Sequence, residues 1–462
     1  AAPVGDLRFA APAPVPAWDG VRDATAYGPT APKGPYPPGL DGLLPELSIA
    51  GDDYLNLNVW TPGTDGRRPV LVWIHGGAFV NGSGSIRGYD GTRFARDGVV
   101  CVTINYRLGA EGFLHVDGAP ANRGLLDQVA ALTWVRDNIA AFGGDPDTVT
   151  IAGESAGAMS VTTLTAMPSA QGLFRRVIAQ SGGGHHVMSA ATATAVARAL
   201  AEDLGVDATA DGFRSVSTDR LVQAQDALSL RIAAQPDPAV WGEIAGDSMA
   251  FEPCVDGDVL PARPIDTLAR TTAGVDMLVG SNADEALLFL VPNGMIDLVA
   301  DDMLLASAAG FGIDAAALAT YRAALPDATA GDLLAALVRD RTFWIPAVRM
   351  AETRLEAGLP TYVYEFAWRT PQLAGRLGAA HALEIAFVFD NLDDPEGEAF
   401  VGPKPPQHLA DAMHAAWVAF VTDGNPGWDP YGAARTVMRF DDASAVVHDP
   451  MPELRAVWTG VR

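Results

Sequence analysis

The stretch TVTIAGESAGAMSV, residues 148–161, decides how this chain must fold. An apolar, β-branched run ends at Gly153, and Ser155 follows with small residues on both sides. The G-x-S-x-G spacing is typical of a sharp turn from strand to helix that exposes a nucleophilic hydroxyl. The same spacing also suits a glycine-rich connection without chemistry, so the chain around it has to decide between the two.

Short apolar runs and helical patterns alternate on both sides of this turn. We predict buried strands in residues 68–76, 98–106, 147–153, 175–182, 275–282 and 361–368. Residues 123–144 place apolar side chains at helical spacing and end in two glycines, which predicts a helix. This alternation favours an α/β fold, with a mostly parallel central sheet covered by helices on both faces. Ser155 would then lie at the carboxyl end of a strand, where parallel sheets form their sites.

The 462 residues are expected to form a single domain, because no linker composition interrupts them. Residues from about 185 to 260 and from about 295 to 350 are alanine-rich and helical in pattern, and we interpret them as insertions over the sheet and the site. The proline-rich segments FAAPAPVPAW and KGPYPPGL are expected to be extended surface chain.

The charge balance excludes some classes of partner. The net charge is −25, and Lys33 and Lys404 are the only lysines. Nucleic acids and anionic membrane surfaces require clustered basic residues, so neither is an expected partner. No apolar run is long enough to span a bilayer. Cys101 and Cys254 are too few and too distant for a disulfide framework or a metal site.

A serine nucleophile needs donors for the oxyanion that forms when it attacks a carbonyl group. The run VWIHGGAF places Gly76, Gly77 and Ala78 directly after a predicted strand, where small residues let backbone N–H groups converge. Ala156, the residue after the serine, would add a further donor. We therefore predict an oxyanion hole from these four residues; the alternative is a plain glycine-rich turn.

The serine also needs a histidine as base and an acid that orients it, and in this fold they follow the serine in the order acid, then histidine. His381 fits that order, whereas His75 and His115 come too early. His414 has the surroundings of an ordinary helix residue. The pair His185-His186 lacks a third ligand at a familiar spacing and predicts a surface loop rather than a metal site.

The acid is expected after the predicted strand at 275–282. Asp284 and Glu285 follow each other in the run SNADEALLF, and position alone does not separate them. Either carboxylate could orient the histidine. The alternative is that both are simply placed at a helix N-terminus, where acidic residues are favoured.

The assembled blocks resemble the type-B carboxylesterase and cholinesterase family of the α/β-hydrolase fold. They include PVGDLRF, DDYLNLNVWTP, VWIHGGAF, INYRLGAEGFL, TIAGESAGA, LVGSNADEALLF and HALEIAFVF, in the family's order. The resemblance implies Ser155 as nucleophile, His381 as base and Glu285 rather than Asp284 as acid. It also implies that Glu154 lies beside the site and that Ser181 is a supporting hydrogen-bond partner.

Two departures from the family pattern stand out. Tyr54 occupies the position where the family often has a disulfide-bonded cysteine, which suggests a bacterial member similar to the para-nitrobenzyl esterases. The chain also lacks the few dozen residues that usually precede PVGDLRF, so we expect an N-terminal β segment to be missing. A cytoplasmic location is favoured, with secretion the alternative if a leader was removed.

The expected function is hydrolysis of carboxylic esters through a Ser-His-Glu triad and an acyl-enzyme, without cofactor or metal. The expected partner is a small-molecule ester, and no oligomeric state is predicted. Phe343, Trp344 and Trp241 are candidates for lining the pocket or for ordinary core. The alternatives are the same machinery acting on a lactone, thioester, carbamate or amide, and a non-catalytic neuroligin-like binding protein.

Overall fold

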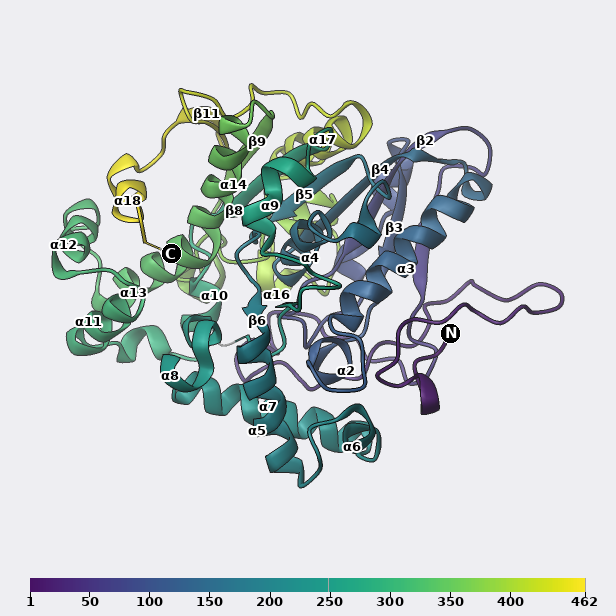
Figure 1. Ribbon diagram of the computed structural model, residues 1–462. Helices are drawn as coiled ribbons and strands as arrows, with labels where there is room; N and C mark the ends of the chain where they lie inside the picture. The colour runs from purple at the N-terminus through teal and green to yellow at the C-terminus, as the bar shows by residue number, and fades with distance from the viewer. Residues whose placement is uncertain (248, 462) are drawn as a thin grey trace. The chain divides into compact units, whose positions relative to one another are not determined.

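The computed structural model describes residues 1–247 and 249–461, which form two compact units. Unit 1 comprises Ala1–Tyr36, Glu46–Ile178 and Gly184–Val275, and unit 2 comprises Pro37–Pro45, Ala179–Gly183 and Asp276–Arg462. Figure 1 colours the chain by residue number, so that most of unit 1 runs from purple to teal and the long segment of unit 2 from Asp276 onward continues through green to yellow. The prediction of a single domain stays a prediction.

The strands of unit 1 are arranged around β2 (Arg68–Ile74), as Figure 1 shows. β2 pairs in parallel with β3 (Val100–Ile104) and with β4 (Gly144–Glu154). β1 (Leu57–Trp60) pairs antiparallel with β3. Ile74, the last residue of β2, lies opposite Gly153 of β4, so the segments that follow the two strands begin side by side.

Helices of unit 1 follow the predicted pattern. α3 (Arg123–Asn138) continues as a short 3-10 helix, Ile139–Phe142, and Gly143 in the left-handed region ends it. α4 (Ala156–Leu164) begins directly after Ser155. The residues interpreted as the first insertion contain α5 (Ala190–Leu204), α6 (Ala210–Arg214), α7 (Thr218–Ala234) and α8 (Pro238–Trp241). The remaining elements of unit 1 are α1 (Thr92–Arg96), α2 (Gly109–Phe113), β6 (Met188–Ser189), β7 (Cys254–Val255) and α9 (Pro264–Thr271).

The strands of unit 2 repeat the parallel arrangement. β9 (Thr361–Phe366) lies between β8 (Asp276–Asn282) and β10 (Thr436–Phe440) and is parallel to both. β11 (Ala445–His448) closes this edge antiparallel to β10. Asn282 pairs with Phe366 at the last position of β8 and β9, so the segments carrying Glu285 and His381 start from the same edge.

β5 (Arg176–Gln180) begins in unit 1 and ends in unit 2, and all five of its residues are buried. The residues interpreted as the second insertion contain α11 (Asp301–Gly310), α12 (Ala315–Ala324), α13 (Ala330–Arg339) and the start of α14 (Ile345–Glu356). A π-helical turn, Asp340–Trp344, joins α13 to α14. The other helices of unit 2 are α10 (Leu287–Leu290), α15 (Ile385–Val388), α16 (Glu398–Val401), α17 (Gln407–Asp423) and α18 (Pro452–Val457).

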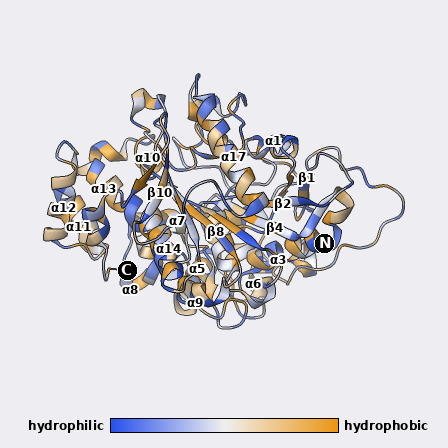
Figure 2. Cartoon of the chain, turned by 90° about the horizontal axis from the view of Figure 1, so that it is seen from above, coloured by the Kyte–Doolittle hydropathy of each residue, from blue (hydrophilic) through white to orange (hydrophobic). Residues whose placement is uncertain are grey.

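Hydropathy separates the strands from the helices. Residues of β2, β3 and β8 are almost all buried, and the central strands carry orange segments in Figure 2. Helices such as α12 carry both orange and blue segments, as surface helices do. In the described part of the chain no single helix meets the length and hydropathy needed to cross a bilayer; α11 and α12 meet them only as a pair, bent by 118°.

Candidate active site

The turn at Ser155 explains the small residues around it. Ser155 has φ 57° and ψ −124°, a strained conformation for a residue with a side chain, and it stands between β4 and α4. A Cβ on Gly153 would lie 2.5 Å from the carbonyl carbon of Gly157 and 2.6 Å from the carbonyl oxygen of Ile74. A Cβ on Gly157 would collide with that same Ile74 oxygen. The helix therefore passes so close to β2 that only glycine fits two residues before and two residues after the serine.

The predicted oxyanion residues lie against this turn. A Cβ on Gly76 would be 2.7 Å from the Glu154 carbonyl oxygen and 3.0 Å from Ser155 Cβ. Gly77 and Ala78 have φ of 108° and 52°. These left-handed residues turn the backbone of the loop after β2 sharply beside the serine. Within unit 1 the structure thus places Gly76 against Ser155, with Gly77 and Ala78 following in the same loop and Ala156 following the serine as the first residue of α4.

Glu154 lies next to the same turn. It is buried, and a Cβ on Gly76 would lie 3.0 Å from its Oε2. The carboxylate therefore lies against the oxyanion loop, which we define as residues 75–82.

His75 takes no part as a base in this arrangement. Its Nδ1 donates to the Gly76 carbonyl oxygen at 2.8 Å, and its ring stacks on Tyr106 at 4.5 Å between centroids. Burial lowers the pKa of His75 to about 3. The ring is therefore neutral at any ordinary assay pH, and it serves as a packing element of the loop.

Glu285 and His381 form a buried hydrogen-bonded pair in unit 2. Glu285 Oε2 lies 2.6 Å from His381 Nδ1, and neither side chain is more than 6% exposed. Glu285 Oε1 accepts from Ser181 Oγ at 2.6 Å and from the backbone N–H of Asn282 at 2.7 Å. This set of donors fixes the carboxylate, which then holds the imidazole with its hydrogen on Nδ1.

Asp284, which the sequence could not separate from Glu285, has different partners. Its Oδ2 accepts from Arg369 Nη1 at 2.7 Å and from the backbone N–H of Ala379 at 2.9 Å. The contact with His381 is made by Glu285 alone among the two. Asp284 instead ties the loop after β8 to the segment that leads into His381.

Two aromatic rings flank His381. Phe289 lies 5.3 Å and Phe343 4.7 Å from its ring, measured between centroids. Phe343 is placed by the π-helical turn and is buried, whereas Phe289 is 38% exposed. Trp344 and Trp241 are buried in unit 2 and unit 1, respectively. Phe343 is thus the sequence candidate that touches a predicted site residue.

Sequence reasoning missed a set of hydrogen-bonded polar residues near Glu285, namely Asn282, Gln180 and Glu384. Asn282 Nδ2 donates to Ala380 O at 2.7 Å and to Glu384 Oε2 at 2.6 Å. Gln180 Nε2 donates to Glu384 Oε1 at 3.0 Å. These three residues come from distant parts of the sequence, and no spacing rule connects them. Glu384, three residues after His381, was the one available signal.

Two sequence expectations about other residues are corrected. His186 is buried, not on a surface loop, because the segment SGGGHHVM packs into the structure before β6. Lys33, in the proline-rich segment expected at the surface, has a side chain that is only 1% exposed. Among residues 1–247 and 249–461, no group of three or more His, Cys, Asp and Glu side chains has the geometry to hold a metal ion.

Solved structures of similar chains define the class. A carboxylesterase of Geobacillus stearothermophilus, Est55, matches with a TM-score of 0.85 and 38% identity, over 99% of this chain and 94% of that one. A PNB esterase matches with a TM-score of 0.84 and 36% identity, over 99% and 93%. The protein is therefore an α/β hydrolase with a mostly parallel central sheet flanked by helices, as predicted.

Sequence comparison narrows the class to one family. The model of the carboxylesterase family matches residues 1–448, and the chain belongs to that family. A para-nitrobenzyl esterase of Bacillus subtilis (strain 168) is 38% identical over 98% of this chain and 92% of its own length. A phenmedipham hydrolase of Pseudarthrobacter oxydans is also 38% identical, over 98% and 90%. The protein is a carboxylic ester hydrolase.

Proposed function

We propose that this protein hydrolyses small carboxylic esters through Ser155, His381 and Glu285, by way of an acyl-enzyme. The observation that carries the proposal is the 2.6 Å hydrogen bond between Glu285 Oε2 and His381 Nδ1. It sets the histidine tautomer, so that Nε2 is the nitrogen that accepts a proton. The strained turn at Ser155 supports the same assignment, because it presents the hydroxyl at the end of β4.

In the first half-reaction Ser155 Oγ attacks the ester carbonyl carbon while its proton passes to His381 Nε2. The carbonyl oxygen becomes an oxyanion, which the N–H groups of the Gly76–Ala78 turn and of Ala156 stabilise. Glu285 stabilises the imidazolium that forms. The bond to the alcohol oxygen then breaks, and His381 returns the proton to that oxygen, which leaves an acyl-serine.

In the second half-reaction a water molecule replaces the alcohol. His381 Nε2 takes a proton from the water as its oxygen attacks the acyl carbon, and the same donors hold the second oxyanion. Collapse of this intermediate breaks the bond to Ser155 Oγ, which recovers its proton from His381. The products are the carboxylic acid and the alcohol.

The test compares hydrolysis of para-nitrophenyl butyrate by the wild type, Ser155→Ala and Ser160→Ala. Ser160 is the matched control, because it lies on the same helix with its hydroxyl buried against Gln128 at 3.0 Å. We expect Ser155→Ala to lower kcat by a factor on the order of 10⁶, while Ser160→Ala changes it little. Turnover near the wild-type rate in Ser155→Ala would refute the assignment.

The same assay separates the alternatives. Turnover of the matching thioester or anilide but not of the ester would favour another acyl bond as the substrate. A folded wild type without turnover of any of them would reject the proposed triad.

A further inference from the structure

The inference concerns a buried lysine next to the oxyanion loop. Lys33 Nζ donates to the carbonyl oxygens of Leu47 at 2.8 Å and Gly82 at 3.1 Å, and it lies 3.0 Å from Glu46 Oε1. The side chains of Lys33 and Glu46 are 1% and 17% exposed. The three oxygens match the three N–H donors of an ammonium group. Burial lowers the pKa of Lys33, and the Glu46 carboxylate opposes that shift.

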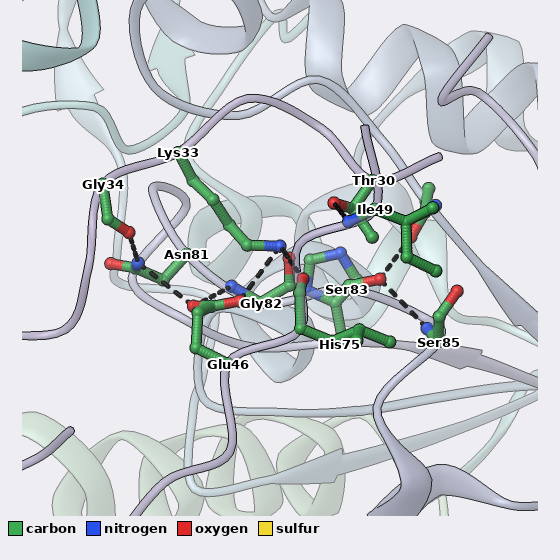
Figure 3. A network of polar contacts seen from close by, with 12 residues as sticks. Thr30, Lys33, Gly34, Glu46, Ile49, His75, Asn81, Gly82, Ser83 and Ser85 are labelled. Carbon is green, nitrogen blue, oxygen red and sulfur yellow. Dashed lines mark hydrogen bonds and ion pairs between the residues drawn. The ribbon is translucent and has the colours of Figure 1, made fainter. Parts of the chain in front are cut away.

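Glu46 binds the other side of the same residue, Gly82, together with the Asn81 side chain. Its Oε2 lies 3.2 Å from Asn81 Nδ2 and 3.4 Å from the backbone N–H of Gly82, and both groups donate to it. Asn81 Nδ2 also donates to Gly34 O at 2.8 Å. Figure 3 shows Lys33 and Glu46 converging on the segment Asn81–Gly82 beside His75. The Asn81–Gly82 segment is thus held through its side chain, its N–H and its carbonyl group.

Gly77 packs against the backbone of the Asn81–Gly82 segment. A Cβ on Gly77 would lie 2.5 Å from the Asn81 carbonyl carbon and 3.0 Å from the Gly82 nitrogen. The N–H groups of Val80 and Asn81 donate to the Gly77 carbonyl oxygen at 2.9 and 2.8 Å. Gly77 therefore rests directly on the Asn81–Gly82 peptide, backbone against backbone, with no side chain to absorb a shift.

We propose that Lys33 and Glu46 are positioning residues, which hold the Asn81–Gly82 segment and through it aim the Gly77 N–H at the oxyanion. The inference rests on the proposed function for its chemical consequence, but its structural part stands on the contacts alone. The choice of lysine agrees with it: the chain uses arginine almost everywhere else. A compact ammonium meets three convergent oxygens in a way that a planar guanidinium does not.

Stability alone accounts poorly for this buried pair. A buried ion pair loses so much hydration that it is often no more stabilising than packed apolar residues. Oxyanion donors, in contrast, must be within a few tenths of an ångström of their position to act. We therefore expect the loss of the pair to appear mainly in the transition state.

The test compares Lys33→Met and Glu46→Gln with two controls. Arg8→Met breaks another buried ion pair of unit 1, Arg8 with Glu111 at 2.6 Å, and Lys404→Met makes the same substitution at an exposed lysine. We expect Lys33→Met to lower kcat by roughly 10- to 100-fold with KM changed less than about threefold. Affinity for a trifluoromethyl ketone should fall in proportion to kcat/KM, while affinity for the matching methyl ketone should not.

Hydrogen exchange supplies a readout that does not need activity. Peptides covering residues 77–82 should exchange faster in Lys33→Met and in Glu46→Gln than in the wild type, and not in Arg8→Met or Lys404→Met. Repeating the exchange in a Ser155→Ala background keeps this arm valid even if the wild type proves not to be a serine esterase. Glu46→Gln preserves the side-chain shape and carries the test if Lys33→Met does not fold.

The outcomes separate the two proposals. Faster exchange confined to residues 77–82, together with a loss in kcat, supports the positioning role. Unchanged exchange in a folded variant overturns it, as does a loss that appears in KM alone. Faster exchange in a protein without Ser155-dependent turnover would retain the structural brace and reject the proposed function.

Discussion

At the scale of single residues, the site depends on glycines, which have no Cβ atom. Gly157 is the sharpest case, because a Cβ there would collide with the Ile74 carbonyl oxygen of the neighbouring strand. Alanine is normally the better helix residue by about 1 kcal/mol, so the sign of a substitution reports which effect is larger. Backbone gives way less readily than a side chain, and we expect the collision to dominate.

Gly157→Ala should therefore lower the free energy of unfolding by roughly 1–3 kcal/mol, measured by urea denaturation. Gly310→Ala is the matched control: Gly310 is the last residue of α11, and a Cβ there would have open space around it. The control should be neutral or slightly stabilising. Equal effects at the two positions would contradict the close approach of α4 to β2.

At the scale of elements, the two neighbouring acids in the loop after β8 have different partners in the loop after β9. Glu285 holds the His381 ring, and Asp284 holds the backbone N–H of Ala379 together with Arg369. Sequence alone could not assign these roles, because consecutive residues share a turn and a charge. The turn after β8 separates them, because it directs Glu285 toward the imidazole and Asp284 toward the Ala379 N–H.

Because the two acids have different partners, the same change from acid to amide is predicted to have different effects at Glu285 and at Asp284. Glu285→Gln should lower kcat by about 10⁴-fold, because an amide favours the wrong histidine tautomer. Asp284→Asn retains an acceptor for the Ala379 N–H, and we expect a loss of less than about tenfold. Steady-state hydrolysis of para-nitrophenyl butyrate measures both, and similar losses would mean that the acids share the role.

At the scale of the whole molecule, one buried ring contributes to acid sensitivity. The pKa of His75 is lowered by burial to about 3, from an ordinary value near 6.5. The unfolded chain therefore binds a proton at this residue that the folded protein rejects between these two values. The contribution to stability is present at neutral pH and is lost as the pH falls from about 6.5 toward 3.

His75→Asn should accordingly flatten the pH dependence of stability. Between pH 7 and pH 5 the loss in unfolding free energy should be smaller than in the wild type by about 2 kcal/mol. His448→Asn, at an exposed position of β11, serves as the control. Carboxylates contribute equally in all three proteins, so an unchanged difference in His75→Asn would show that the ring does not stay neutral.

Much of the fold could be predicted because buried parallel strands are continuous apolar runs, and β2, β3, β4 and β8 all lie where such runs occur. The glycines around Ser155 also predicted the position of the turn, because two backbone segments that approach closely require glycine there. The buried role of Lys33 left no such signal. Its segment has neither helical nor strand periodicity, and its partner Glu46 becomes a neighbour only through the tertiary fold.

The burial of Lys33 also affects how the protein can be coupled to a label or a support through its lysine side chains. Of the two lysines, one is enclosed and Lys404 is exposed, so a reagent that acylates side-chain amines has one accessible target in the folded chain. Among the lysines, a dye, a polymer or a solid support would therefore be joined at Lys404 of unit 2. Labelling of Lys33 under the same conditions would then measure the fraction of molecules in which Lys33 has become accessible to the reagent.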